Sequence, residues 1–175
     1  MVPQSMSEKS YDGAFTAYRI VRAGNPVFDG SGAARWGGRW TGPGRAVIHA
    51  AESYALAVLE NLVHFNANEL PPHLLVCQIG IPKSISRQIV RRGEVPEFDS
   101  GTSYEACRAI GDRWHEEAST ALLIVPSRLS PFECNFLIHP LHKESRTLSV
   151  GDPMPARLDE RLEGLLTNQR KLKQK

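Results

Sequence analysis

Two nearly continuous apolar segments constrain the fold of this chain more than any other feature of its sequence. They are LLVCQIGI at residues 74–81 and TALLIVPS at residues 120–127. A strand with one face in water alternates apolar and polar residues, whereas a strand that is buried on both faces reads as an unbroken apolar run. Both segments therefore predict strands buried on both faces at the centre of a sheet.

The other apolar patterns predict shorter strands and three helices around this core. Strands are expected at 16–22, 46–50, 133–140 and 146–150, and helices at 54–66, 104–117 and 155–166, with Ser53 and Ser103 as the N-caps of the first two. Strands and helices do not alternate strictly, which argues against a doubly wound sheet. We therefore predict one α+β domain over residues 1–175, with a flexible N-terminus at 1–14 and a basic tail at 167–175.

The segment at 23–45 is rich in glycine, arginine and tryptophan and lies between the first two predicted strands. A loop of this length without structure of its own is uncommon in a compact domain and is usually functional or disordered. Phe28, Trp36 and Trp40 give this one apolar side chains to bury, so an ordered loop is predicted. Its composition favours a binding function, because arginine holds phosphates and carboxylates in a bidentate geometry.

The distribution of charge argues against direct binding of nucleic acid. The formal net charge is +2, but four basic residues fall within the last six of the chain, and without them 17 basic residues face 19 acidic ones. Proteins that grip a nucleic-acid backbone concentrate positive charge on their folded surface. The chain has 15 arginines against 6 lysines, a bias that suits geometric recognition of anions.

Targeting and redox signals are also missing from the sequence. The first residues, MVPQSMSEKSYDG, contain no apolar run, and no segment approaches the ~18 consecutive apolar residues that a membrane span needs. A cytoplasmic protein that does not contact membranes is therefore expected. Cys77, Cys107 and Cys134 lie far apart in apolar sequence without a C-x-x-C pair, which predicts three buried thiols and neither disulfides nor a zinc site.

Several familiar catalytic motifs are absent. GGRWTGPG lacks the Gly-Lys-Ser/Thr of a phosphate-binding P-loop, and no G-x-G-x-x-G is present. His115 lacks the second histidine of a zinc-protease helix, and His139 and His142 are interpreted as loop histidines, so no metal is predicted. Ser127 has no glycines of a nucleophile elbow around it.

A scattered polar set remains, each member on or beside a predicted core element: Arg19, Arg39, His49, Glu60 and Ser127. Glu60 falls at the edge of the apolar face of helix 54–66, where a carboxylate can line a cleft. Taken one by one, most of these residues fit ordinary structural roles. Together with the arginine- and tryptophan-rich loop, they predict a cleft for a ligand that carries both anionic groups and flat rings.

Four segments of the chain resemble the RES domain family, which is named for arginine, glutamate and serine. They are YRIVRAG, GGRWTGPGRAVIHAAESYALAVLENLVH, LLIVPSRLSPFECNFLIHP and ARLDERL, spread over about 18–162. The resemblance implies an ADP-ribosyltransferase-like fold with a mixed, mainly antiparallel sheet and flanking helices. It also implies a bacterial toxin of a toxin–antitoxin pair that consumes NAD, with an Xre-like helix-turn-helix antitoxin as its partner, a homodimeric state, and contact with DNA only through the antitoxin.

By position, the resemblance assigns catalysis to Glu60, Arg19 and Ser127, and NAD binding to Arg39, Trp40, His49 and Asn135. Glu60 would stabilise the ribose cation, the two arginines would hold the pyrophosphate, Ser127 would orient Glu60 or the ribose, and Trp40 or Trp36 would stack on a ring. Three positions depart from the family pattern: Thr41 and His139 stand where Asn is common, and His49 stands where Tyr is common.

The chemistry of NAD fits a single carboxylate independently of the family name. Nicotinamide is already a cationic leaving group, so no second carboxylic acid has to protonate it. The residues leave the acceptor open between water, phosphate and a protein side chain. NAD hydrolysis or phosphorolysis, ADP-ribosylation of a host protein, and a non-catalytic module that binds NAD or a partner all remain alternatives.

Overall fold

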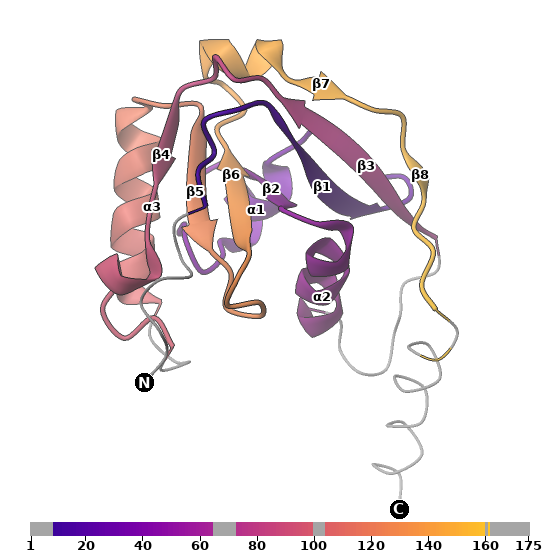
Figure 1. Ribbon diagram of the computed structural model, residues 1–175, viewed down its shortest axis with the longest axis horizontal. Helices are drawn as coiled ribbons and strands as arrows, with labels where there is room; N and C mark the ends of the chain where they lie inside the picture. The colour runs from indigo at the N-terminus through magenta and orange to yellow at the C-terminus, as the bar shows by residue number, and fades with distance from the viewer. Residues whose placement is uncertain (1–8, 65–72, 100–103, 160, 162–175) are drawn as a thin grey trace, which may run out of the picture.

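The computed structural model describes residues 9–64, 73–99, 104–159 and 161. Its centre is one curled sheet with the strand order β4-β5-β6-β2-β1-β3-β7, and β8 also pairs with β3. Figure 1 shows this sheet arching over α2, with α3 beside its β4–β5 end. The strands are β1 (Phe15–Arg22), β2 (Ile48–Ala51), β3 (Leu74–Ile81), β4 (Arg87–Ile89), β5 (Leu122–Pro126), β6 (Cys134–Ile138), β7 (Ser149–Val150) and β8 (Met154–Pro155).

The described residues also contain three α-helices and two short 3₁₀ helices. These are α1 (Ser31–Trp36), α2 (Tyr54–His64), α3 (Glu105–Glu117), η2 (Arg92–Glu94) and η3 (Lys143–Thr147). The pair β4–β5 is parallel, and the other strand pairs of the described sheet are antiparallel. The predicted α+β class with a mixed, mainly antiparallel sheet is therefore confirmed.

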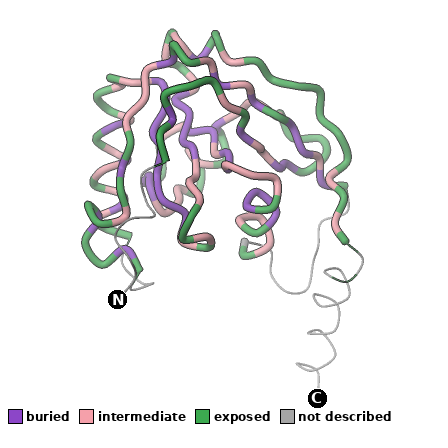
Figure 2. The backbone as a smooth tube through the Cα atoms, viewed as in Figure 1, coloured by how far each residue is buried: buried purple, intermediate pink, exposed green. Residues whose placement is uncertain are grey.

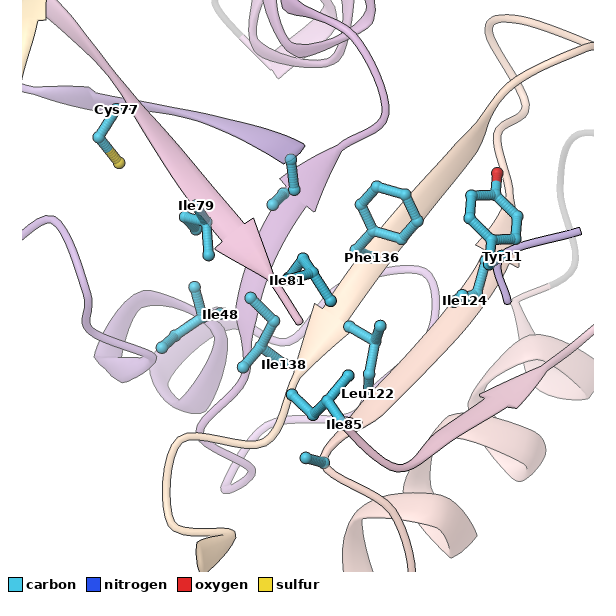
Figure 3. Packing of buried hydrophobic residues seen from close by; sticks show 13 residues of the cluster. Tyr11, Ile48, Cys77, Ile79, Ile81, Ile85, Leu122, Ile124, Phe136 and Ile138 are labelled. Carbon is cyan, nitrogen blue, oxygen red and sulfur yellow. The ribbon is translucent and has the colours of Figure 1, made fainter. Parts of the chain in front are cut away.

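The core lies on both faces of the central strands because successive side chains of a strand point to opposite faces. On one face, Leu122 and Ile124 of β5 join Phe136 and Ile138 of β6. Figure 3 shows these side chains among Ile48, Ile79 and Ile81 from the neighbouring strands. On the other face, Leu123, Val125 and Leu137 pack with Trp114 of α3.

The two apolar runs differ in how far they are buried. All five residues of β5 are buried, as predicted, whereas Gln78 of β3 is exposed. The reason is position: β5 lies between β4 and β6, while β3 is covered at its outer edge only by the short, exposed strands β7 and β8. Figure 2 shows this gradient of burial from the centre of the sheet to that edge.

The loop at 23–45 is ordered, as predicted, but it contains the helix α1, which the sequence analysis did not anticipate. The helix ends at Gly37, whose φ of 66° suits a residue without a Cβ, and the Gly37 N–H donates to Ala33 O at 2.7 Å. Phe28 packs against the core, whereas Trp36 is 73% exposed and its ring lies under the guanidinium of Arg35, within its own helix.

Four further predictions about elements need correction. The segment 82–101, in which the sequence analysis places no helix or strand, contains β4 and η2, because β4 extends the sheet beside β5. The predicted strand 146–150 is reduced to β7, since Arg146 and Thr147 belong to η3. Residues 155–159 of the predicted helix 155–166 are not helical, and Pro155 instead pairs with β3 as part of β8. Arg161 is helical, and residues 160 and 162–166 lie outside the described residues. The N-cap of α3 is Tyr104, and Ser103 lies outside the described residues.

Other predictions hold or fall partly outside the described part. The Leu56 N–H donates to Ser53 Oγ at 3.0 Å, which confirms Ser53 as a cap of α2. The cysteines are free thiols, two buried and Cys134 partly so, and burial raises the pKa of each. Within the expected flexible N-terminus, Tyr11 is buried in the core. Residues 1–8 and the basic tail lie outside the described residues. None of the described helices is long and apolar enough to cross a membrane.

Candidate active site

A cavity of about 520 Å³ opens between β1, β2, β6, α2 and the start of α3. This volume lies within the range of typical small-molecule sites. Six of the seven site residues named from the sequence line it: Arg19, Arg39, Trp40, His49, Glu60 and Asn135. The seventh, Ser127, is fully buried and contacts the cavity through Glu60. The fold therefore brings together residues that are up to 116 positions apart between Arg19 and Asn135.

The Glu60 carboxylate accepts hydrogen bonds from two side chains. Ser127 Oγ donates to Glu60 Oε1 at 2.9 Å, and Asn135 Nδ2 donates to the same oxygen at 2.6 Å. Both bonds end on Oε1, so Oε2 accepts neither of them. The carboxyl group is thereby fixed in orientation at the wall of the cavity, which is the condition for it to act on a bound ligand without further reorganisation.

The hydrogen bonds of Ser127 determine where its proton points. A serine hydroxyl has one donor hydrogen and two acceptor lone pairs. Ser127 Oγ accepts from the N–H groups of Leu129 at 3.1 Å and Ser130 at 3.2 Å. Since both acceptor positions are used, the remaining O–H is directed at Glu60.

The apolar face of α2 differs from the predicted one. Leu56 and Val58 are buried, whereas Leu59 and Val63, which the helical periodicity places on the same face, are 44% and 59% exposed. Val63 lines the cavity together with Glu60. Glu60 therefore lies beside exposed apolar side chains, at the mouth of the site, as well as at the edge of the core.

Arg19 donates hydrogen bonds to backbone carbonyls around the site. Its Nε donates to Val27 O at 2.8 Å, Nη1 to His49 O at 2.7 Å and Nη2 to Asp29 O at 3.0 Å. Burial lowers the pKa of Arg19, and the charges of Cys77 and Asp29 act in the opposite direction. Three of its five N–H groups are thus used to tie the loop at 27–29 to β2, which leaves two for a ligand.

Arg39, in contrast to Arg19, has an N–H group that the described part of the protein does not use in a hydrogen bond. Its Nη1 is buried and makes no hydrogen bond by geometry within the described part of the chain, while the guanidinium lies beside the Cys107 thiol and opposes the rise of the thiol's pKa caused by burial. The guanidinium lies over the ring of Tyr104, 4.4 Å from its centroid, and 5.9 Å from that of Phe98. An unpaired, buried, charged N–H group is costly, and a ligand anion would satisfy it.

Trp40 and His49 occupy the inner part of the cavity wall. Trp40 is only 4% exposed, and its ring packs at 36° against Phe98 with the centroids 5.9 Å apart. His49 pairs with Leu137 across β2 and β6. Trp36 is not among the lining residues, so Trp40 is the tryptophan that reaches the site.

Among the lining residues with polar side chains, the sequence analysis missed five: Tyr18, Asn61, Tyr104, Arg108 and Arg128. Tyr104 and Arg108 are four positions apart at the start of α3, a spacing that puts them on one face of a helix, and Arg128 directly follows Ser127. These spacings in the sequence could have indicated that the three residues lie near the site. With them, four arginines and one carboxylate line the cavity, a balance that favours a ligand with several negative charges.

The histidines outside the cavity form a separate group. The rings of His115 and His139 stack with their centroids 4.5 Å apart, and His142 lies 6.5 Å from His139. Burial and the neighbouring His115 lower the pKa of His139. Among the described residues, no three His, Cys, Asp or Glu side chains are arranged to hold a metal ion.

Comparison with known proteins identifies the family of the chain. Residues 16–159 match the family model described as RES domain. A protein of Sphingobium sp. (strain YBL2) named "Prs ADP-ribosylating toxin" is 37% identical over 124 residues, which cover 69% of this chain and 77% of that protein. A protein of Yersinia enterocolitica named "Toxin Res" is 36% identical over 148 residues, which cover 83% of this chain and 97% of that protein.

The fold is similar to that of a chain in the crystal structure of the M. tuberculosis MbcT–MbcA toxin–antitoxin complex. The TM-score is 0.67 at 18% identity, with 87% of this chain and 88% of the other covered. This likeness confirms the predicted fold class, a mixed and mainly antiparallel sheet with flanking helices. The match of the family model, the identities over most of two toxins and the convergence of Arg19, Glu60 and Ser127 lead to one conclusion: the chain belongs to the RES domain family of toxins.

Proposed function

We propose that this protein is the toxin of a toxin–antitoxin pair and that it cleaves the bond between nicotinamide and ribose in NAD. The observation that carries the proposal is the single carboxylate, Glu60, fixed by two donors in a cavity lined by four arginines. NAD combines two phosphates, two flat rings and one cationic leaving group. The cavity offers arginines for the phosphates, the ring of Trp40 for a flat ring and the carboxylate of Glu60 for the positive charge.

The proposed reaction breaks the glycosidic C–N bond, and its electron pair leaves with the pyridinium nitrogen as neutral nicotinamide. The ribose carbon gains cationic character in the transition state, and the carboxylate of Glu60 stabilises it. Water or phosphate then forms the new bond to that carbon and gives up a proton to solvent. Arg39, with its unpaired Nη1, holds the pyrophosphate, with Arg19 as a second contact through its two remaining N–H groups.

The test is NMR of the purified protein with NAD, in phosphate buffer and in a buffer without phosphate. Release of nicotinamide is expected, and dependence on phosphate would identify phosphorolysis. Glu60→Gln should lower the rate at least about 100-fold, because the amide keeps the shape and loses the charge. Glu117→Gln, on an exposed residue of α3, is the matched control. Undiminished release by Glu60→Gln would overturn the mechanism.

A second candidate is transfer of ADP-ribose to a protein. The name of the Sphingobium relative, an ADP-ribosylating toxin, favours it. The same site serves both reactions, since only the acceptor differs. NAD labelled in the adenine ring separates them: label that stays in small molecules supports hydrolysis or phosphorolysis, and label that moves to a protein supports transfer. The third alternative is a non-catalytic module that binds NAD or a partner. It predicts no release of nicotinamide, whether or not calorimetry detects NAD binding.

The proposed partner is an Xre-like helix-turn-helix antitoxin, and contact with DNA would come only through it. Support comes from the structural relative, which was solved as a toxin–antitoxin complex, and from the exposed apolar side chains of Val63 and Leu129 at the cavity. Homodimerisation is part of the same proposal. Light scattering of the protein alone and with its co-purified partner gives both stoichiometries.

A further inference from the structure

A network behind Ser127 links the catalytic centre to the segment at 92–99. Arg92, in η2, donates from Nη2 to Ser127 O at 2.6 Å and forms an ion pair with Asp99. The next residue after Ser127 makes the reverse connection, since Arg128 Nη2 donates to Asp99 O at 3.3 Å. The two segments therefore hold each other by side chain to backbone bonds in both directions.

The aromatic packing around Arg92 joins this network to the cavity wall. The Arg92 guanidinium lies 4.9 Å from the centroid of the Phe98 ring. The same ring contacts Trp40 and the guanidinium of Arg39, both of which line the cavity. The side chain of Arg92 is 28% exposed, and Arg92 is not among the residues that line the cavity.

We infer that Arg92 is a positioning residue, which orients the Ser127 hydroxyl toward Glu60 by fixing the Ser127 carbonyl. The inference rests on the proposed function, because Glu60 is the group whose orientation matters there. The Ser127 N–H donates to Glu133 O at 3.0 Å on one side, and Arg92 holds the carbonyl on the other. With both ends of the residue fixed, the direction of its side chain follows.

The energetic reason is preorganisation. The single proton of Ser127 Oγ reaches Glu60 only while its lone pairs accept from Leu129 and Ser130. Those two N–H groups belong to the turn that begins with the peptide whose carbonyl Arg92 holds. Release of that carbonyl lets the turn rotate, and the Ser127–Glu60 bond loses its alignment, although no atom of the cavity wall is removed.

The experiment compares kcat and KM for nicotinamide release in Arg92→Ala, Arg92→Lys, Ser127→Ala and the double variant Arg92→Ala/Ser127→Ala. Arg91→Ala is the matched control, because the Arg91 side chain is 57% exposed and forms its ion pair with Glu94, away from Ser127. Arg92→Ala should lower kcat about 10-fold, as expected when a supporting contact of an active site is lost, with KM within about twofold. Arg92→Lys should restore part of the loss, since an ammonium can still donate to the carbonyl.

The double variant decides whether Arg92 acts through Ser127. If it does, removal of Arg92 has no further effect on kcat once Ser127 is Ala. Equal losses in both backgrounds, or an unchanged kcat in Arg92→Ala, would overturn the inference. Should circular dichroism show Arg92→Ala to be unfolded, Arg92→Gln replaces it, because its amide keeps one donor.

A readout without catalysis separates this inference from the proposed function. The carbon NMR resonance of the Glu60 side-chain carboxyl should move in Arg92→Ala toward its position in Ser127→Ala, and should stay in place in Arg91→Ala. If the wild-type protein releases no nicotinamide, the proposed function fails while this measurement still decides the role of Arg92. An unmoved resonance in Arg92→Ala contradicts the inference.

Discussion

The two arginines expected to bind pyrophosphate differ in how many of their N–H groups the protein itself uses. Arg19 donates to three backbone carbonyls, so its main effect is on the shape of the loop and of β2. Arg39 has a buried Nη1 without a partner among the described residues. A bound anion would satisfy that group, so under the proposed function Arg39 is expected to contribute more directly to affinity than Arg19.

Arg39→Gln should therefore weaken NAD binding about 10-fold to 100-fold, the worth of one hydrogen bond to a charged group. Calorimetry with NAD measures the change, in a Glu60→Gln background so that the ligand is not consumed. Arg35→Gln is the control, because Arg35 contacts Trp36 and does not line the cavity. Equal affinities of Arg39→Gln and the control would exclude a direct contact with the ligand.

Helix α3 fixes the loop that forms one wall of the site. The Gly42 N–H donates to Asp112 Oδ1 at 2.8 Å, Arg108 Nε donates to Gly38 O at 3.0 Å, and Arg45 forms ion pairs with Asp112 and Glu116. The helix can come this close because of Gly111: a Cβ there would lie 1.8 Å from Trp40 O, a backbone atom that cannot move alone.

Gly111→Ala should destabilise the protein by about 1–3 kcal/mol or more, because the helix and the loop must separate to admit the methyl group. Gly32→Ala is the opposite case: a Cβ at this position in α1 meets nothing within 4 Å, and alanine in a helix gains about 0.5–1 kcal/mol over glycine. Urea unfolding of both variants gives the two free energies. A Gly111→Ala midpoint at or above that of the wild type would show the loop to be mobile.

The stability of the whole molecule should depend on pH through His139. Its ring is 6% exposed and stacked on His115, and its pKa is lowered by burial first and then by the neighbouring histidines. The unfolded chain therefore binds this proton at a higher pH than the folded protein does. Stability contributed by the neutral ring is complete above the ordinary value of 6.5 and is lost as the pH falls below it.

The corresponding prediction is that the urea midpoint falls between pH 7.5 and pH 5.5 and falls less in His139→Asn. Asparagine has an acceptor for the Leu141 N–H, which His139 Nδ1 accepts at 3.3 Å, and does not titrate. His73→Asn, at an exposed site, is the control and should keep the wild-type slope. A His139→Asn slope equal to that of the wild type would assign the pH dependence to other groups.

Local patterns in the chain were sufficient for the elements whose burial and capping are decided nearby. The apolar run of β5, the Ser53 cap of α2 and the position of Glu60 on that helix follow from periodicity and cap chemistry. The short elements α1, β4 and β8 did not follow, and β7 is shorter than predicted. Each is two to six residues long, and strand pairing or packing with distant segments decides its conformation.

The sequence by itself determined the family and which residue types are available to the proposed site: a carboxylate, several arginines and a serine. The tertiary structure alone decided how the members divide the work. It gave Ser127 and Asn135 to the same oxygen of Glu60, used Arg19 on the backbone, left Arg39 Nη1 unpaired and added Arg108 and Arg128 to the wall. The reason is physical: residue types set which bonds are possible, and only folding fixes which donors and acceptors come within about 3 Å of one another.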